Sequence, residues 1–138
     1  SSIAYYLSQA GIGLSTIVHV GGDAVVGLSH PEVVELFEED PETKAVVLFG
    51  EIGTTQEEQV AELVASGKVR KPLLAFVGGR AATSGTRFSH AGAIVEGKRG
   101  SYETKVRRLR EAGVHVVESV ADIPRQAREI IQREEKGL

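Results

Sequence analysis

The sequence predicts an α/β fold in which a mainly parallel sheet carries helices on both faces, as a three-layer sandwich. Three features lead to this expectation. Strand-like and helix-like patterns alternate along the chain. The strand-like runs are short and apolar, as in parallel strands that are buried on both faces. Glycine-rich stretches follow these runs directly, and ligands of such sheets bind beyond the carboxyl ends of the strands.

Four runs are interpreted as strands because each is short, apolar and bounded by turn residues. They are Thr16 to Val20, Ala45 to Phe49, Leu73 to Val77 and Val114 to Val117. Three glycine-rich stretches follow the first three runs, and we expect them to gather at one edge of the sheet. They are Gly21-Gly22-Asp23, Gly50 to Gly53, and Gly78-Gly79.

Helices are expected between these runs, at recognisable start and stop signals. Pro31 suits the first turn of the second helix. The apolar face of that helix is expected to be Val33, Val34, Leu36 and Phe37. Thr55 and Glu58 fit a capping box that opens the third helix. The other helices are expected around Ile3 to Ala10, after a cap at Ser101, and over Asp122 to Arg133.

Composition limits the possible classes of protein. The chain has 138 residues, of which 41% are hydrophobic and 25% charged, which suits one compact globular domain. The net charge of -3 gives no reason to expect nucleic acid or a membrane surface as a partner. Cysteine is absent, which excludes a disulfide framework and thiolate metal ligands. No apolar run approaches transmembrane length and no signal peptide is visible, so we expect a cytoplasmic location.

His90 is the first candidate for chemistry. It sits among small residues, between Ser89 and Ala91-Gly92-Ala93, after a long loop. Small neighbours leave the imidazole reachable and let backbone amides approach an anion. A neutral imidazole is a nucleophile near pH 7. The alternative interpretation is an ordinary surface-loop histidine without a role.

Glu51 is the second candidate, because it follows the second predicted strand within Gly50-Glu51-Ile52-Gly53. A carboxylate at a strand's carboxyl end could accept a hydrogen bond from an imidazole N–H, which leaves the other ring nitrogen free to attack phosphorus. The alternative is a solvated acid that the dipole of the following helix favours.

Thr54, Thr55 and Gln56 open the third helix, whose free N–H groups could bind phosphate. The glycine pairs do not form a P-loop or a dinucleotide fingerprint, since the required lysine and spacing are missing. A cluster of basic residues is expected to form a solvated helix face. Its members are Lys105, Arg107, Arg108 and Arg110. The remaining histidines look structural, and no metal site is expected. They are His19, His30 and His115.

Several segments together resemble, in order, the α subunit of the succinyl-CoA synthetase family. The resemblance covers essentially the whole chain, and the combination of Gly-Glu-Ile-Gly with a later His-Ala-Gly-Ala is specific. The segments are Gly11 to Thr16, Gly21-Gly22-Asp23, Gly50 to Gly53, Lys71-Pro72, Gly78 to Ala82, His90 to Ile94 and Glu111 to Val114.

The resemblance implies a flavodoxin-like ligase domain spanning residues 1–138, in which His90 becomes phosphohistidine and Glu51 orients it. The phosphate- and substrate-binding residues would be Gly53, Thr54, Ser89 and Gly92. The family's α subunit also has an N-terminal CoA-binding Rossmann domain, which this sequence does not include. It pairs with a β subunit of ATP-grasp type, as a heterodimer or heterotetramer. CoA and Mg-ATP or Mg-GTP belong to that intact enzyme, and this domain alone is expected to bind no cofactor.

The implied activity is that of an acid–thiol ligase forming a nucleoside diphosphate, with the isolated domain inactive. The sequence departs from the family pattern at Ser89, at Thr83-Ser84 and at Thr54 after Gly53, so the acid stays open. ATP-citrate lyase, malate-CoA ligase and NDP-forming acetyl-CoA synthetase are alternatives with an equivalent domain. A docking module without chemistry is the other alternative. A flavin-binding flavodoxin relative is disfavoured because a Ser/Thr-rich phosphate loop is missing after the first strand.

Overall fold

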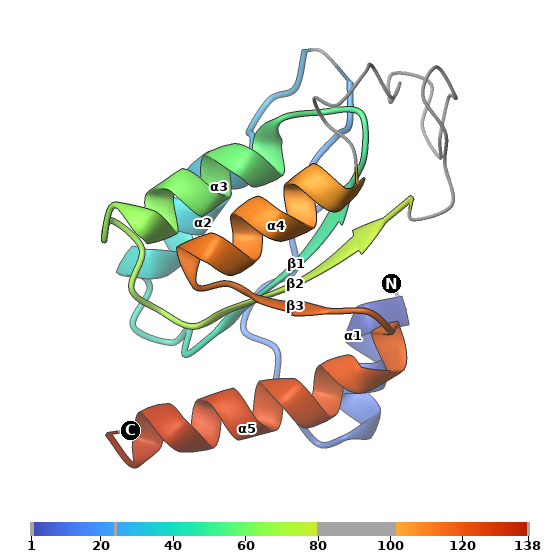
Figure 1. Ribbon diagram of the computed structural model, residues 1–138. Coiled ribbons are helices and arrows are strands. Elements are labelled where there is room, and N and C mark those ends of the chain that lie inside the picture. Colours follow the sequence, from blue (N-terminus) through green and yellow to red (C-terminus); the bar gives the residue numbers. More distant parts are fainter. Residues whose placement is uncertain (1, 24, 80–101, 138) are drawn as a thin grey trace.

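The computed structural model describes residues 2–23, 25–79 and 102–137 and has an α/β architecture built on a parallel sheet (Figure 1). The sheet has three strands in the order β1-β2-β3. They are β1 (Val46–Glu51), β2 (Leu73–Gly78) and β3 (His115–Val117). β1 pairs with β2 from Val46↔Leu73 to Glu51↔Gly78, and both pairs of strands are parallel. The last residues of β1 and β2 therefore lie side by side at one edge.

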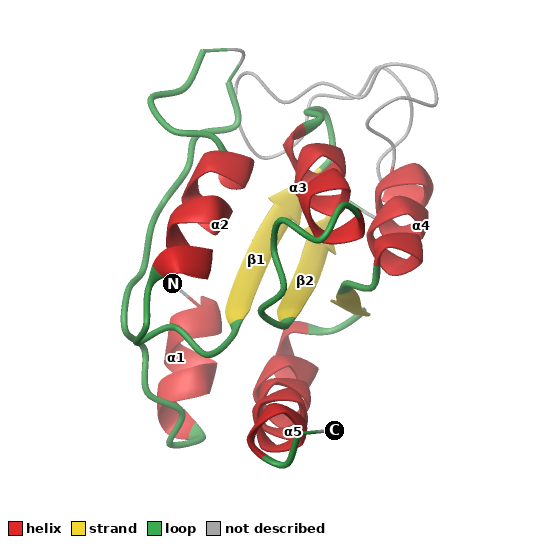
Figure 2. Ribbon diagram, turned by 90° about the vertical axis from the view of Figure 1, so that its left-hand side faces the viewer, coloured by secondary structure: helices red, strands yellow, loops and turns green. Residues whose placement is uncertain are grey.

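The helices lie on both faces of this sheet, so the predicted three-layer, flavodoxin-like arrangement is confirmed (Figures 1 and 2). One face carries α2 (His30–Glu39), α3 (Gln56–Ala65) and α4 (Tyr102–Ala112). The other face carries α1 (Ser2–Gln9) and α5 (Ile123–Glu135), which follows a short 3₁₀ turn, η1 (Val120–Asp122).

The two apolar cores lie on opposite faces of β2, because successive side chains of a strand point to opposite faces of the sheet. Leu73, Ala75 and Val77 pack under α2, α3 and α4, whereas Leu74 and Phe76 pack toward α1 and α5. Both faces of β2 are thus buried, as its continuous apolar sequence predicted.

The predicted strand at Thr16 to Val20 is wrong for the part of the chain that the structure describes. The other three strands are confirmed with small shifts at their ends. Residues 16–20 belong to no strand, and they are mostly exposed. A strand exists only where its backbone has a ladder partner, and β1 forms its ladder with β2 on one side only.

Two details of the predicted helices also need correction. Leu36 was expected on the apolar face of α2, but it is 59% exposed while Val33 and Val34 are buried. The capping box was expected at Thr55 and Glu58, but the Thr55 side chain makes no capping hydrogen bond. A complete capping box stands at α2, where Ser29 and Glu32 bond reciprocally. The predicted cap at Ser101 lies outside the described residues.

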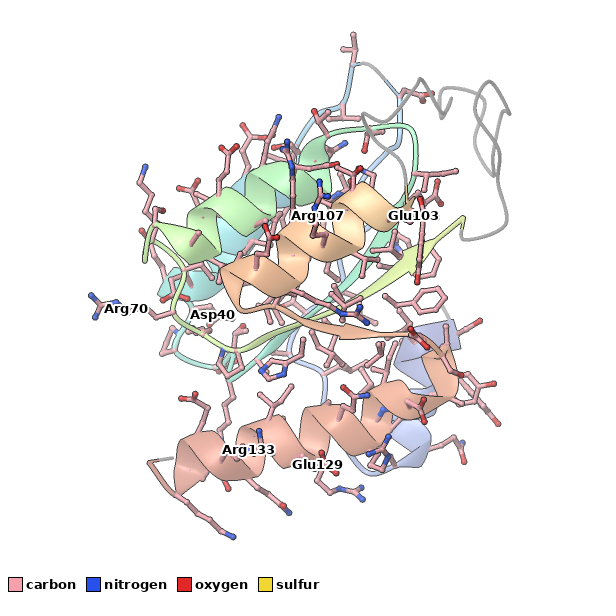
Figure 3. All side chains as sticks on the ribbon, viewed as in Figure 1. Asp40, Arg70, Glu103, Arg107, Glu129 and Arg133 are labelled. Carbon is pink, nitrogen blue, oxygen red and sulfur yellow. The ribbon has the colours of Figure 1, made fainter. Side chains whose placement is uncertain are left out.

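Most of the charged side chains project outward from the helices into solvent (Figure 3). Within the described residues, no helix is both long enough and apolar enough to cross a membrane.

Gly79, which follows β2, and Ile52, which follows β1, are in close contact. Gly79 has a φ of +100°, and a Cβ atom placed there would lie 2.7 Å from Ile52 Cγ1. Ile52 is 1% exposed and has little room to move. Only glycine satisfies both the backbone conformation and the close approach.

We expect Gly79→Ala to destabilise the fold by about 1–3 kcal/mol more than Gly113→Ala. Gly113 has the same φ of +100° but nothing within 4 Å of its Cβ position, so it isolates the cost of the backbone conformation. Urea denaturation of both variants measures the difference. Equal losses would show that the Ile52 contact relaxes at no cost.

Candidate functional site

The predicted gathering of glycine-rich stretches at the carboxyl edge of the sheet is confirmed. Glu51, the last residue of β1, is registered with Gly78 of β2. The Gln56 side chain, at the start of α3, donates from Nε2 to the carbonyl of Gly21 at 3.3 Å. Residues 21–22, 50–53 and 78–79 therefore meet around the first turn of α3.

His90, Ser89 and Gly92 lie outside the described residues. The described part of the predicted site is Glu51, Gly53 and Thr54, which share the turn between β1 and α3. The approach of His90 to Glu51 therefore stays a prediction.

The turn from β1 to α3 is held by the Glu57 carboxylate. Its Oε1 accepts a hydrogen bond from the Glu51 backbone N–H at 3.0 Å, and its Oε2 accepts one from Thr54 Oγ1 at 3.2 Å. Gly50 makes this approach possible, because a Cβ atom there would lie 2.7 Å from Glu57 Cγ. The glycine before Glu51 thus serves to let Glu57 reach the turn that carries Glu51.

Lys105 reaches the same turn from α4. Its Nζ lies 2.8 Å from Glu57 Oε2 and 2.8 Å from Glu58 Oε2, and it also donates to the carbonyl of Thr54. Lys105 is 0% exposed, which makes the prediction of a solvated position for this residue wrong. The three side chains of Glu57, Glu58 and Lys105 form what we call the buried ion triad.

The buried ion triad combines two carboxylates with one ammonium group, which leaves a formal excess of one negative charge. Both carboxylates lie in the first turn of α3. The positive end of the helix dipole stabilises negative charge there. Buried charges are tolerated only when they are paired and hydrogen-bonded, so each member depends on the others.

A helical spacing could have revealed Lys105. Tyr102, Lys105, Val106 and Leu109 follow an i, i+3, i+4, i+7 pattern, in which Lys105 holds a core-facing position. The same contact explains the failed capping box, because Glu58 is bound to Lys105 instead of turning back toward Thr55.

His30 packs against this network from the start of α2. Its backbone N–H donates to Gln56 Oε1 at 2.7 Å. Burial lowers the pKa of the His30 imidazole, and the Lys105 ammonium acts in the same direction, whereas the Glu57 carboxylate and the Gln56 side chain oppose the shift. The predicted structural character of His30 agrees with this packing. His19 and His115 are exposed.

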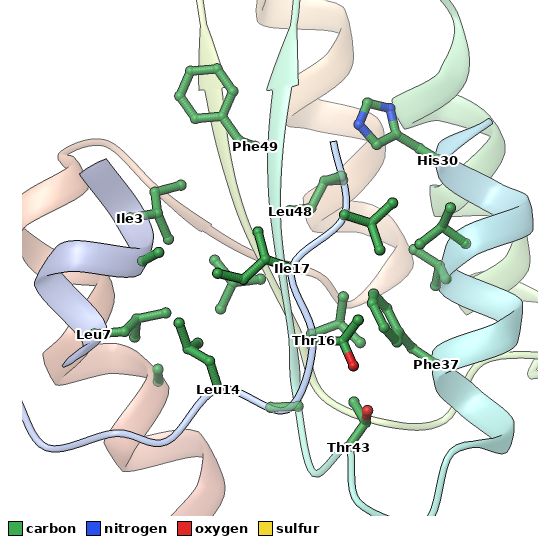
Figure 4. Close-up of a pocket in the computed structure, with 18 of the residues that line it drawn as sticks. Ile3, Leu7, Leu14, Thr16, Ile17, His30, Phe37, Thr43, Leu48 and Phe49 are labelled. Atoms are coloured by element: carbon green, nitrogen blue, oxygen red, sulfur yellow. The ribbon is translucent and has the colours of Figure 1, made fainter. Parts of the chain in front are cut away.

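A cavity of about 900 Å³ lies beside β1, on the side away from β2 (Figure 4). Its walls are mainly aliphatic side chains from α1, from residues 12–20, from β1 and from α2. Glu51, Thr54 and Glu57 line one end of it. The cavity therefore borders the turn that holds Glu51 but consists mostly of apolar surface.

The turn at the start of α3 is held in place by side-chain hydrogen bonds. The Thr54 hydroxyl and carbonyl are engaged by Glu57 and Lys105, so this residue contributes rigidity. The Thr55 side chain caps none of the first N–H groups of α3. Among the described residues, no group of three or more histidine and acidic side chains could hold a metal ion.

Comparison with known proteins gives consistent similarities. The family model described as CoA-ligase matches residues 2–115. The chain is 48% identical to the succinate–CoA ligase [ADP-forming] subunit alpha 1 of Archaeoglobus fulgidus, over 91% of this chain and 43% of that protein. It is 43% identical to an ADP-forming sulfoacetate-CoA ligase subunit of Acholeplasma, over 96% of this chain and 43% of that protein. The chain thus spans less than half the length of these relatives.

Solved structures agree with the sequence relatives. ATP citrate lyase of Methanosaeta concilii, in complex with (3S)-citryl-CoA, superposes with a TM-score of 0.76 at 26% identity. The match covers 85% of this chain and 20% of that one.

We expect Lys105→Met to destabilise the fold by about 3–5 kcal/mol, because it leaves two buried carboxylates without their cation. Arg107→Met is the matched control, since Arg107 is exposed on the same helix, and it should change stability by no more than about 0.5 kcal/mol. Chemical denaturation measures both. A Lys105→Met variant as stable as the control would contradict the structural role of the buried ion triad.

The lowered pKa of His30 predicts a loss of stability in mild acid. Below about pH 6.5 the unfolded chain takes up a proton on this imidazole that the folded chain resists, so stability falls as the pH falls. The melting temperature should therefore decrease more steeply from about pH 7 to pH 5 in the native protein than in His30→Gln. Parallel curves for the two proteins would show that His30 is as easily protonated in the folded state as in the unfolded state.

Proposed function

The chain belongs to the CoA-ligase family, and we propose that it is the ligase domain of an ADP- or GDP-forming acyl-CoA synthetase of the succinyl-CoA synthetase type, with His90 as the phosphoryl carrier. The observation that supports this best is the turn at the end of β1. There, Glu51 ends a buried strand and is held by the Glu57 carboxylate beside the amide groups that open α3.

The proposed reaction has three balanced steps. Acyl-CoA and phosphate give an acyl phosphate and free CoA. A neutral ring nitrogen of His90 then attacks phosphorus, the P–O bond to the acyl group breaks, and the carboxylic acid leaves as its carboxylate. The ring gives up its proton to leave a phosphohistidine, which passes the phosphoryl group to a nucleoside diphosphate. All three steps are reversible.

Glu51 is proposed as a positioning residue for His90. Its carboxylate would accept a hydrogen bond from one ring N–H, which fixes the tautomer and favours the positive charge that develops on the ring. Gly53, Thr54, Ser89 and Gly92 are proposed to contact the phosphoryl oxygens or to shape the loop that does. The buried ion triad supports this function by holding the turn of Glu51 in one conformation.

The remaining components of the enzyme are proposed from the relatives. A CoA-binding domain of the same subunit and an ATP-grasp-type β subunit with Mg-nucleotide would supply the other substrates. Relatives named for succinate and sulfoacetate share this domain at 43–48% identity. We therefore propose that this domain performs the common phosphoryl transfer and that the choice of acid depends on other parts of the enzyme.

The proposal predicts that His90→Asn abolishes acid-labile, base-stable phosphate on this subunit, assayed in the full-length complex with a β subunit and Mg-ATP. Glu51→Gln should slow the labelling by about 10- to 100-fold while the fold is kept. Glu62→Gln, on the exposed side of α3, should label at the native rate.

Two results would count against these roles. Native labelling kinetics in Glu51→Gln would remove the role of Glu51. Absence of label in the native complex would remove the phosphohistidine relay and favour a docking module without chemistry.

A further inference from the structure

The loop that leads from Gly21 into α2 is closed by one buried side chain, that of Gln56. Gln56 Oε1 accepts a hydrogen bond from the backbone N–H of His30 at 2.7 Å, and Gln56 Nε2 donates one to the carbonyl of Gly21 at 3.3 Å. A glutamine amide is both a donor and an acceptor, so it can satisfy two backbone groups of opposite kind. Gln56 therefore joins the two ends of the loop over residues 22–29 to the first turn of α3.

The same loop is also packed from within. A Cβ atom on Gly21 would lie 3.2 Å from Val26 Cγ1, so the half-buried Val26 side chain lies against the start of the loop. Ser29 ends the loop as the cap of α2 and exchanges hydrogen bonds with Glu32. A surface loop whose ends are joined and whose interior is filled by its own side chains is an Ω-loop, and loops of this class frequently carry function.

The loop closed by Gln56 borders the turn that carries Glu51. Gln56 and Glu57 are consecutive residues of α3, so their side chains leave the helix about 100° apart and reach different segments. Gln56 holds the two ends of the loop, whereas Glu57 accepts a hydrogen bond from the backbone N–H of Glu51. Both ends of the loop and Glu51 also line the same cavity. The first turn of α3 thus fixes the loop and the Glu51 turn relative to each other.

The exposed surface of this loop is apolar. Val25 is 89% exposed and Leu28 is 50% exposed. Single apolar residues are common on protein surfaces, but these two share one closed loop at the carboxyl edge of the sheet, where ligands of such folds bind. Apolar groups beside a reacting centre exclude water and so prevent the hydrolysis of reactive intermediates. The loop has the composition and the position for that task.

We propose that Gln56 is a further positioning residue of the phosphoryl-transfer site, and that the loop it closes shields the phosphohistidine from water. The inference rests on the proposed function, since it requires a phosphoryl group on His90. Hydrolysis would form a P–O bond to water and break the P–N bond. One proton of the water would pass to the ring nitrogen, and inorganic phosphate would leave. A closed loop beside Glu51 slows this loss and keeps the phosphoryl group for its proper acceptor.

The decay of the phosphohistidine in water tests the proposal in the complex of the full-length subunit with a β subunit. After labelling with Mg-ATP the nucleotide is removed, and the label is followed without CoA, acid or nucleoside diphosphate. In Gln56→Ala the loss of both hydrogen bonds should speed the decay by about 10- to 100-fold, because the loop opens more often. Gln59→Ala is the matched control, since Gln59 is exposed on the same helix, and its label should decay at the native rate.

Equal decay rates in Gln56→Ala and Gln59→Ala would overturn the proposal. A purely structural role for Gln56 gives that same result, because it lowers the melting temperature of Gln56→Ala and leaves the decay rate of the folded complex unchanged. Absence of label in the native complex would instead contradict the phosphohistidine itself. Failure of the present inference is therefore distinguishable from failure of the proposed function.

A double substitution in the loop gives a second test that leaves Gln56 in place. Val25→Ser combined with Leu28→Ser removes exposed apolar surface and touches neither hydrogen bond of Gln56. This variant should accept the label and then lose it faster than the native complex. Decay at the native rate would overturn the shielding role. Failure of the variant to bind the β subunit would overturn it in favour of a docking role for the loop.

Discussion

The contact on which the rest of the site depends is the ion pair between Lys105 and the two carboxylates at the start of α3. Glu57 is the central group, since it bonds the backbone of Glu51, the hydroxyl of Thr54 and the ammonium of Lys105. One charge network thereby joins β1, α3 and α4. Replacing such a triad with apolar side chains often costs nothing in stability, so we infer that the role of the triad is to define one turn geometry. The turn so defined is the one that ends in Glu51, Gly53 and Thr54.

The two sides of β1 differ in a way that explains the layout of the molecule. Toward α3 and α4, the carboxyl end of β1 meets buried charges whose partners are all present. Along its other edge, where the described structure has no strand, β1 borders a mainly aliphatic cavity. The chemistry is therefore expected at the end of the cavity, by Glu51, and not in its middle.

Much of the fold was predictable because local patterns and tertiary structure agree. β1 and β2 contain continuous apolar runs followed by glycine, and β3 contains the apolar pair Val116-Val117. α5 has Pro124 in its first turn and an apolar face that is buried. The predictions failed where the structure of a segment depends on a contact with a residue far away in the sequence. Thr16 to Val20 have strand propensity, but a strand requires a ladder partner. Glu58 fits a capping box locally, but a lysine 47 residues away binds it instead. Leu36 fits the apolar stripe of α2, but no other described residue buries it.

The sequence by itself determined the fold class, the family and the identity of the candidate residues, because these depend on local periodicity and on short motifs such as Gly-Glu-Ile-Gly. Only the tertiary structure decided why the motif has that form. Gly50 admits Glu57, Ile52 fills the space beneath Gly79, and Lys105 loses its solvent to neutralise the carboxylates. Such roles depend on contacts between elements that are far apart in the chain. Burial also changes the free energy of a charged group by more than the local helix or strand propensity of its residue does. A lysine within a run of basic residues is predicted to be solvated, and only the position of the neighbouring helix α3 shows that Lys105 is buried.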